Sequence, residues 1–282
     1  MTVSRRAVGL LWSSLLAATT ASVGLGAAAH PAAQAAGAQR PPASPPPAPA
    51  AAPRALTPKA AAPIDLTGYW VSVVTEDWRW RMVTPARNDF ASLPMTREAE
   101  AVGNAWDPAK DEAAGEQCKS YGAPAVMHVP GRLHITWQDE STLKVETDAG
   151  TQVRVFHFGA WAAPAGEPTW QGDSVAEWET PEPPANAPPP RPAGPAKFGN
   201  LKVVTTHLRP GYIRKNGAPY SANAVLTEYW DLNVEENGER WLVVTSIVHD
   251  PQYLRMDWIT SPNFKAEPNG AKWDPSPCSS FW

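Results

Sequence analysis

Alternating apolar and polar residues predict three consecutive β-strands between residues 201 and 249. Two Asn-Gly dipeptides, Asn216-Gly217 and Asn237-Gly238, separate these strands. Asn-Gly favours two-residue type I′ hairpin turns, because both turn residues need positive φ angles. Two-residue loops at both dipeptides give registers that agree on which face of the sheet is apolar. Since a slip of one residue would move every side chain to the other face, this agreement supports the predicted register.

The predicted register groups several polar side chains on the apolar face. Glu228 lies at the centre of the group, opposite Thr205. His207 and His249 both lie opposite Leu226, which makes them diagonal neighbours of Glu228, within reach of long side chains. The predicted face comprises Leu201, Val203, Thr205, His207, Arg209, Leu226, Glu228, Trp230, Leu232, Trp241, Val243, Thr245, Ile247 and His249.

A further hairpin is predicted around residues 148–150. A three-residue loop there sets Val145 opposite Val153 and places His157 on the apolar face as well. A two-residue loop would instead set Val145 opposite Arg154. The three-residue loop is preferred, because it pairs one apolar residue with another.

Strand patterns recur along most of the remaining chain. One short helix is predicted at residues 94–106, which begin with Pro and show helical spacing. Further strands are predicted at residues 64–73, 126–129, 132–137, 142–147, 152–158, 175–178 and 253–259. About nine or ten short strands with one short helix are typical of a mainly β fold, and we expect an antiparallel barrel.

Composition divides the chain into three parts. Residues 1–35 combine Arg5 and Arg6 with a short apolar stretch and small residues, as in a signal peptide. A twin-arginine signal matches in part, but an ordinary secretory signal is preferred. Residues 36–63 are rich in Ala and Pro and predict a semi-rigid linker, which leaves residues 64–282 as a single β-barrel domain. We therefore expect an exported protein, periplasmic or extracellular, with no transmembrane segment.

The charge distribution bears on the class of partner. All five basic residues before Pro63 lie in the first two parts, which contain no acidic residue. Subtracting these five from the 24 Lys and Arg leaves 19 against 28 Asp and Glu, a formal charge of −9 for the barrel domain. A negative domain of this kind argues against nucleic acid as a partner. No protein partner is indicated either.

The chain contains two cysteines, Cys118 and Cys278. Export would place them in an oxidising compartment, where a disulfide between them is the expected state. Two separate buried thiols are the alternative.

Three runs of sequence resemble a group of uncharacterised exported bacterial proteins: residues 105–118 (AWDPAKDEAAGEQC), 147–151 (TDAGT) and 206–212 (THLRPGY). The similarity covers most of residues 64–278. It implies no activity and no catalytic residues, because none is established for the group. The opening Gly68-x-Trp70 also resembles the first strand of lipocalin-like (calycin) barrels, which favours a lipocalin-like barrel fold.

An apolar barrel interior with a few polar anchors favours binding of a small hydrophobic or aromatic molecule. The 14 Trp residues suit stacking on such a ligand, although for any single one a place in the core or in an exposed turn is the better explanation. The predicted ligand-binding residues are Thr205, Arg209, Tyr212, Trp230, Thr245 and His157.

Catalysis in the same cavity is the alternative function. Glu228 could exchange protons with His207 or His249, as in a small-molecule isomerase, lyase or hydrolase, with Arg209 or Tyr212 stabilising an oxyanion. A buried Glu–His pair with only a structural role is as good an explanation. A zinc site is disfavoured because the two histidines lie two strands apart, roughly 10 Å between backbones. No cofactor is expected, since no Gly-rich phosphate loop, nucleophile elbow or Cys/His cluster occurs.

Overall fold

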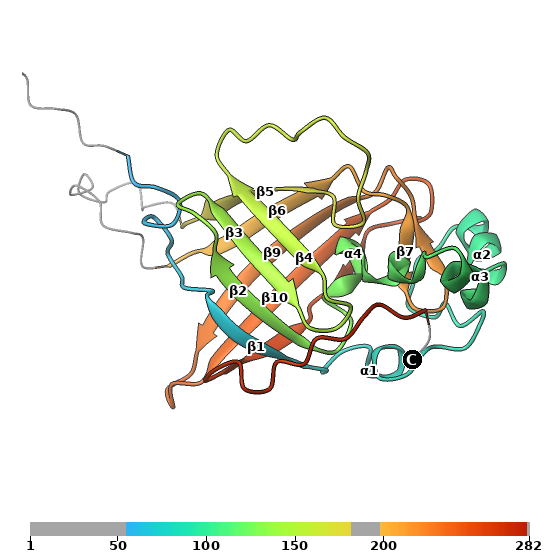
Figure 1. Cartoon of the computed structure of the whole chain (residues 1–282), viewed down its shortest axis with the longest axis horizontal. Coiled ribbons are helices and arrows are strands. Elements are labelled where there is room, and N and C mark those ends of the chain that lie inside the picture. Colours follow the sequence, from blue (N-terminus) through green and yellow to red (C-terminus); the bar gives the residue numbers. More distant parts are fainter. Residues whose placement is uncertain (1–54, 182–197, 281–282) are drawn as a thin grey trace, which may run out of the picture. The chain divides into compact units, whose positions relative to one another are not determined.

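A computed structural model describes residues 55–181 and 198–280. It contains a closed, nine-stranded mixed β-barrel (Figure 1). Neighbouring strands follow the order β10-β12-β1-β2-β3-β4-β5-β6-β9, and β9 pairs with β10 to close the barrel. The predicted signal peptide and most of the predicted linker lie outside the described residues.

The strands are β1 (Gly68–Val73), β2 (Arg132–Trp137), β3 (Thr142–Thr147), β4 (Val153–Phe158), β5 (Asp173–Glu179), β6 (Asn200–Thr206), β7 (Gly211–Arg214), β8 (Ala218–Tyr220), β9 (Val225–Val234), β10 (Arg240–His249), β11 (Trp258–Thr260) and β12 (Asn263–Glu267). The helices are α1 (Trp78–Arg81), α2 (Arg97–Asn104), α3 (Pro108–Ala113) and α4 (Ala123–Val126), with a 3₁₀ turn η1 (Gln117–Tyr121).

The mainly β barrel is confirmed, with differences in detail. The barrel is mixed rather than purely antiparallel, because β4 and β5 run parallel. The described residues contain four helices rather than one, and the predicted strand at residues 126–129 lies instead at the end of α4 and in the turn after it. Pro124 stands in the first turn of α4, a position that suits its fixed φ angle and missing N–H group. Strand β12 was not predicted.

The helices and the small β7–β8 hairpin gather at one end of the barrel (Figure 1), which we call the capped end. Helix α4 and η1 contact β7, and α2 contacts β8. The predicted disulfide between Cys118 and Cys278 is present and fastens η1 to the C-terminal segment. The predicted linker also contacts the barrel. The backbone oxygen of Pro58, near the end of that segment, accepts a hydrogen bond from Trp178 Nε1 at 2.8 Å.

The predicted register between β9 and β10 is wrong by one residue. Glu228 lies opposite Ser246 rather than Ile247. Val234 pairs with Arg240, and Glu235 N donates to Glu239 O, so the turn is a three-residue loop with Gly238 at φ 83°. A left-handed Gly ending a three-residue loop is a common hairpin solution. Because of the slip, Thr245 and His249 lie on the outer face of the barrel.

The predicted loop between β3 and β4 is also wrong. Thr147 N donates to Gln152 O, which makes a four-residue loop and sets Val145 opposite Arg154. From the sequence, the alternative with Val145 opposite Val153 is preferred, because it pairs two apolar residues. Arg154 lies inside the barrel, and His157 lies on the outer face.

Asn216-Gly217 does not connect the barrel strands. It belongs to the separate β7–β8 hairpin, where Arg214 pairs with Ala218. Strand β6 pairs with β9 two residues away from the predicted register, with Val203 rather than Thr205 opposite Glu228. A shift of two residues keeps every side chain on its predicted face, so Thr205 remains on the inner face.

The barrel interior is filled by side chains. Its apolar core is continuous from β1 around to β12, and its members are almost fully buried. Its largest fully buried members are Trp70, Met127, Ile135, Leu143, Phe156, Leu201, Trp230 and Phe264. A second apolar cluster, which includes Met95, Leu208, Tyr220 and Trp258, lies under the capped end.

Candidate functional site

The polar group inside the barrel is an ion pair. Arg154 Nη1 and Nη2 donate to the two Glu228 carboxylate oxygens at 2.8 and 2.5 Å, and both side chains are 0% exposed. Thr205 lies beside them and shares a 2.8 Å hydrogen bond with Ser174. Trp230 packs edge-on against Phe156 with ring centroids 5.3 Å apart. Two parallel hydrogen bonds satisfy the Glu228 carboxylate within the fold.

The histidines predicted to meet Glu228 lie elsewhere. His207 follows the end of β6 with φ 56°, and its Nδ1 lies 2.8 Å from Asp173 Oδ2. His249 Nδ1 lies 2.8 Å from Asp257 Oδ1, and the His249 side chain is 62% exposed. The predicted Glu228–His207–His249 group is therefore not formed.

Two predicted ligand-binding residues lie on the outside of the barrel. Thr245 Oγ1 lies 3.4 Å from Ser261 Oγ. The His157 ring stacks on Trp161 at 4.0 Å between ring centroids, and partial burial lowers the pKa of His157. Neither side chain shares a surface with Thr205 or Trp230.

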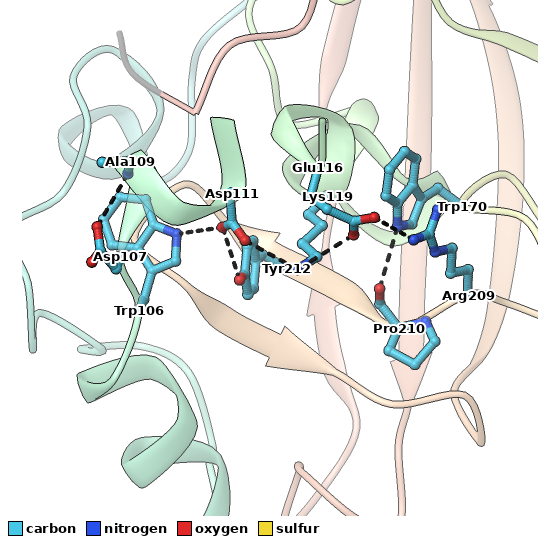
Figure 2. Close-up of polar contacts among 10 residues, drawn as sticks. All are labelled: Trp106, Asp107, Ala109, Asp111, Glu116, Lys119, Trp170, Arg209, Pro210 and Tyr212. Carbon is cyan, nitrogen blue, oxygen red and sulfur yellow. Dashed lines mark hydrogen bonds and ion pairs between the residues drawn. The ribbon is translucent and has the colours of Figure 1, made fainter. Parts of the chain in front are cut away.

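Tyr212 and Arg209 join a network of polar contacts at the capped end (Figure 2). Tyr212 Oη donates to Asp111 Oδ2 at 3.0 Å, and Lys119 Nζ donates to Asp111 Oδ1 at 3.0 Å. Lys119 also lies 3.4 Å from Glu116 Oε2. Burial, and then the negative charge of Asp111, raise the pKa of Tyr212, so its hydroxyl stays protonated at neutral pH.

Arg209 extends this network to the surface (Figure 2). Its Nη2 pairs with Glu116 Oε1 at 2.5 Å, and its guanidinium group lies over the Trp170 ring at 4.4 Å. Trp170 Nε1 in turn donates to Pro210 O at 3.3 Å. These contacts join η1, α3 and β7 to one another.

The three runs of sequence that carry the resemblance meet at the capped end. Residues 105–118 and 206–212 supply most of the network of Figure 2, and Lys119 and Trp170 complete it. In the third run, Gly150 has φ 77°, and a Cβ atom there would lie 2.2 Å from the Tyr121 ring. Ser276 N donates to Asp148 O, which attaches the C-terminal segment to the same turn. These three runs of sequence therefore lie where the cap is attached to the barrel.

A cavity of about 30 Å³ lies at the capped end, between residues that sequence reasoning did not combine. It is lined by Asp77, Trp80, Arg81, Ser120, Ala125, His128, Val129, Ile213, Arg214, Lys215 and Trp258. These side chains come from α1, η1, α4, β7 and β11 and from the turns beside them. These segments are far apart in the sequence, and no local sequence pattern indicates that they lie together in the fold. The one available signal was the alternation of Trp and Arg at residues 78–81.

Burial perturbs the ionisable groups of this cavity. It lowers the pKa of Arg81, and it lowers that of Arg214 to about 10 and that of Lys215 to about 8. Burial, with Arg81 and Arg214 nearby, lowers the pKa of His128 to about 3, so this imidazole is neutral at pH 7. His128 stacks on Trp258, and its Nε2 lies 2.7 Å from Thr260 Oγ1.

Within residues 55–181 and 198–280, no three His, Cys, Asp or Glu side chains are grouped so that they could hold a metal ion. The same residues include no helix with the length and apolar character needed to cross a membrane.

Comparison with protein-family models, with curated proteins and with solved structures gives no match for this chain. The fold thus defines the class, a closed nine-stranded mixed β-barrel with a disulfide-fastened cap.

Proposed function

We propose that this protein binds a small, partly apolar or aromatic molecule, and that the binding site is the cavity at the capped end. The observation that carries the proposal is the lining of this cavity, which combines Trp80 and Trp258 with three cationic side chains. Aromatic walls with a few polar anchors are typical of small-molecule sites. The interior of the barrel, the site expected from sequence, is filled by its own side chains.

A cavity of about 30 Å³ would hold only one part of such a ligand. By the usual measure this is room for about two water molecules. The rest of the ligand would lie in the opening of the cavity. A small cavity with an opening suits a ligand that inserts one compact group into the cavity and leaves a larger apolar part outside it.

We also propose that the protein is exported and that its barrel is of the lipocalin-like kind. The disulfide between Cys118 and Cys278 supports an oxidising compartment. Osmotic-shock fractionation of cells that express the full chain, compared with a chain lacking residues 1–35, tests export. Recovery of both forms in the cytoplasm would contradict it.

The acid–base enzyme gains no support from the geometry. It requires Glu228 to exchange protons with His207 or His249. Glu228 is instead held by Arg154 through two hydrogen bonds inside a filled core. We therefore favour binding over catalysis.

Tryptophan fluorescence of the exported, disulfide-bonded protein tests the binding proposal. We expect saturable quenching by at least one member of a panel of small aromatic and aliphatic molecules. Trp258→Phe should reduce this signal, whereas Trp273→Phe should not, because Trp273 contacts Tyr69 and His134 on the outside of the barrel. No saturable change with any member of the panel would contradict the proposal.

A further inference from the structure

One guanidinium nitrogen of Arg81 has no hydrogen-bond partner among the described residues. Its Nε donates to His128 O at 2.9 Å, and its Nη2 donates to Ser72 Oγ at 3.2 Å. Its Nη1 is buried and has no partner among the described residues, although the residue is only 3% exposed. A buried donor without a partner destabilises the fold, and the cost is larger when the donor is charged. Arg81 lines the cavity, so a group bound there could accept this hydrogen bond.

More of the side chains that line the cavity are cationic than anionic. Its lining contains three cationic side chains, Arg81, Arg214 and Lys215, and one carboxylate, Asp77. Within the described part of the chain, no carboxylate lies within 4.0 Å of a charged nitrogen of Arg81 or Arg214. The nearby Glu76 carboxylate receives the Ser261 N–H between its two oxygens at 2.8 and 2.9 Å, and its negative charge acts on Arg81 without direct contact.

The other cationic groups differ from Arg81 in their hydrogen bonding. Arg214 donates to Ala91 O at 2.9 Å and to Ser92 Oγ at 3.1 Å, and lies over the Trp80 ring. Lys215 Nζ donates to Tyr121 Oη at 2.5 Å. These two residues supply positive charge, whereas Arg81 supplies both charge and an unsatisfied donor. Electrostatic attraction between these cations and an anion in the cavity would be strong, because the buried surroundings have a lower dielectric constant than water.

We infer that the cavity binds the carboxylate group of a small organic acid, with Arg81 Nη1 as its hydrogen-bond donor. This inference rests on the proposed function and names the class of ligand. A carboxylate is about as large as the cavity allows, and a hydrogen bond between two charged groups is among the strongest in proteins. The apolar part of the acid lies outside the cavity, on the side of Asp77 and Trp80, the lining residues that are partly exposed.

Three acid–amide pairs test this inference by calorimetry: benzoate and benzamide, indole-3-acetate and indole-3-acetamide, and hexanoate and hexanamide. Each amide keeps the shape of its acid but lacks the charge. We expect at least one acid to bind about tenfold or more tightly than its amide, since a hydrogen bond to a charged group contributes about 1.5–3 kcal/mol. All titrations use one ionic strength, with inorganic phosphate as a further probe.

Arg81→Gln should abolish the preference for the acid, and Arg87→Gln is the matched control. Arg87 belongs to the same segment, is exposed and does not line the cavity. Its substitution removes the same charge and should change the affinity less than about twofold. If Arg81→Gln does not fold, a crystal structure of the wild-type protein with the tightest acid gives the answer. A carboxylate oxygen within about 3.2 Å of Arg81 Nη1 is the expected result.

The outcomes separate the inference from the proposed function. If an acid and its amide bind equally well, the inference is overturned and small-molecule binding stands. Binding of phosphate without binding of any organic acid overturns the assignment of a carboxylate. A carboxylate bound away from Arg81 in the crystal structure also overturns it. Absence of binding for all acids and amides, together with a negative fluorescence panel, overturns both proposals.

Discussion

Arg154 and Arg81 are both buried, but their surroundings differ. Arg154 lies inside the barrel, where Glu228 takes two of its hydrogen bonds and apolar side chains fill the space around the pair. Arg81 lies at the capped end, where backbone and hydroxyl oxygens take two of its hydrogen bonds and a cavity adjoins it. No carboxylate of the described residues pairs with Arg81.

This difference shows how to separate structural charges from candidate functional ones. A buried charge with a partner of opposite sign and no adjoining space stabilises or specifies the fold. Each arginine keeps one buried nitrogen without a partner among the described residues, Nη1 in Arg81 and Nε in Arg154, but only Arg81 lines the cavity at the capped end. A buried cation that adjoins a cavity can donate a hydrogen bond to a ligand there. Sequence reasoning favoured Glu228 because a carboxylate among apolar residues suggests function, but its partner Arg154 removes the chemical argument.

Removal of the disulfide should have the largest effect and should act mainly on the capped end. Cys118 and Cys278 are 160 residues apart, and closing so long a loop contributes about 5 kcal/mol in the chain-entropy model. The double variant Cys118→Ala/Cys278→Ala should lose a comparable free energy of unfolding, as measured by urea denaturation. Hydrogen exchange should increase more in η1 than in β9. Equal increases in both would remove the distinction between the two regions.

Glu228→Gln should destabilise the barrel by about 3–5 kcal/mol, because it leaves the Arg154 charge buried without a counter-ion. The matched double variant Arg154→Met/Glu228→Leu removes both charges and should recover most of that loss. Chemical denaturation measures both. A loss below about 1 kcal/mol for Glu228→Gln would show that the pair is not the structural charge described above.

His128 should make the capped end sensitive to acid. Its pKa is lowered to about 3 in the folded protein, against about 6.5 in an unfolded chain. The unfolded state therefore takes up the proton first, and the stabilising contribution is complete above pH 6.5 and decreases as the pH falls toward 3. By pH 5 the loss is about 2 kcal/mol.

The measurement is the stability difference between wild type and His128→Gln at pH 7 and at pH 5. We expect this difference to shrink by about 2 kcal/mol at the lower pH. His249→Gln, which changes an exposed imidazole, is the control for general acid effects. A constant difference between wild type and His128→Gln would mean that His128 does not titrate in this way.

His249→Ala should have the smallest effect. Its exposed ion pair with Asp257 is of the kind that contributes at most about 1 kcal/mol, and the change in stability should stay within about 0.5 kcal/mol. Binding of any ligand found in the fluorescence panel should be unchanged. A large loss of ligand affinity in His249→Ala would mean that His249 contributes to binding, and it would contradict the proposal that the ligand binds in the cavity at the capped end.

Part of the site was predictable and part was not. Thr205, Glu228 and Trp230 were placed on the inner face, because an error of two residues between β6 and β9 leaves every side chain on its face. Thr245, His249 and His157 were misplaced, because the loop lengths at Gly238 and Gly150 differ by one residue from those chosen. Hairpin loops of two, three and four residues are all common, so a turn dipeptide does not decide the register.

The sequence by itself determined the mainly β class, the positions of most strands and the pairing of the two cysteines. These follow from local periodicity, turn residues and the small number of possible partners. Only the tertiary structure decided that Arg154 enters the barrel to pair with Glu228, and that segments around Arg81, His128 and Lys215 surround one cavity. Contacts between distant segments depend on how the chain closes on itself, and no local pattern encodes that closure.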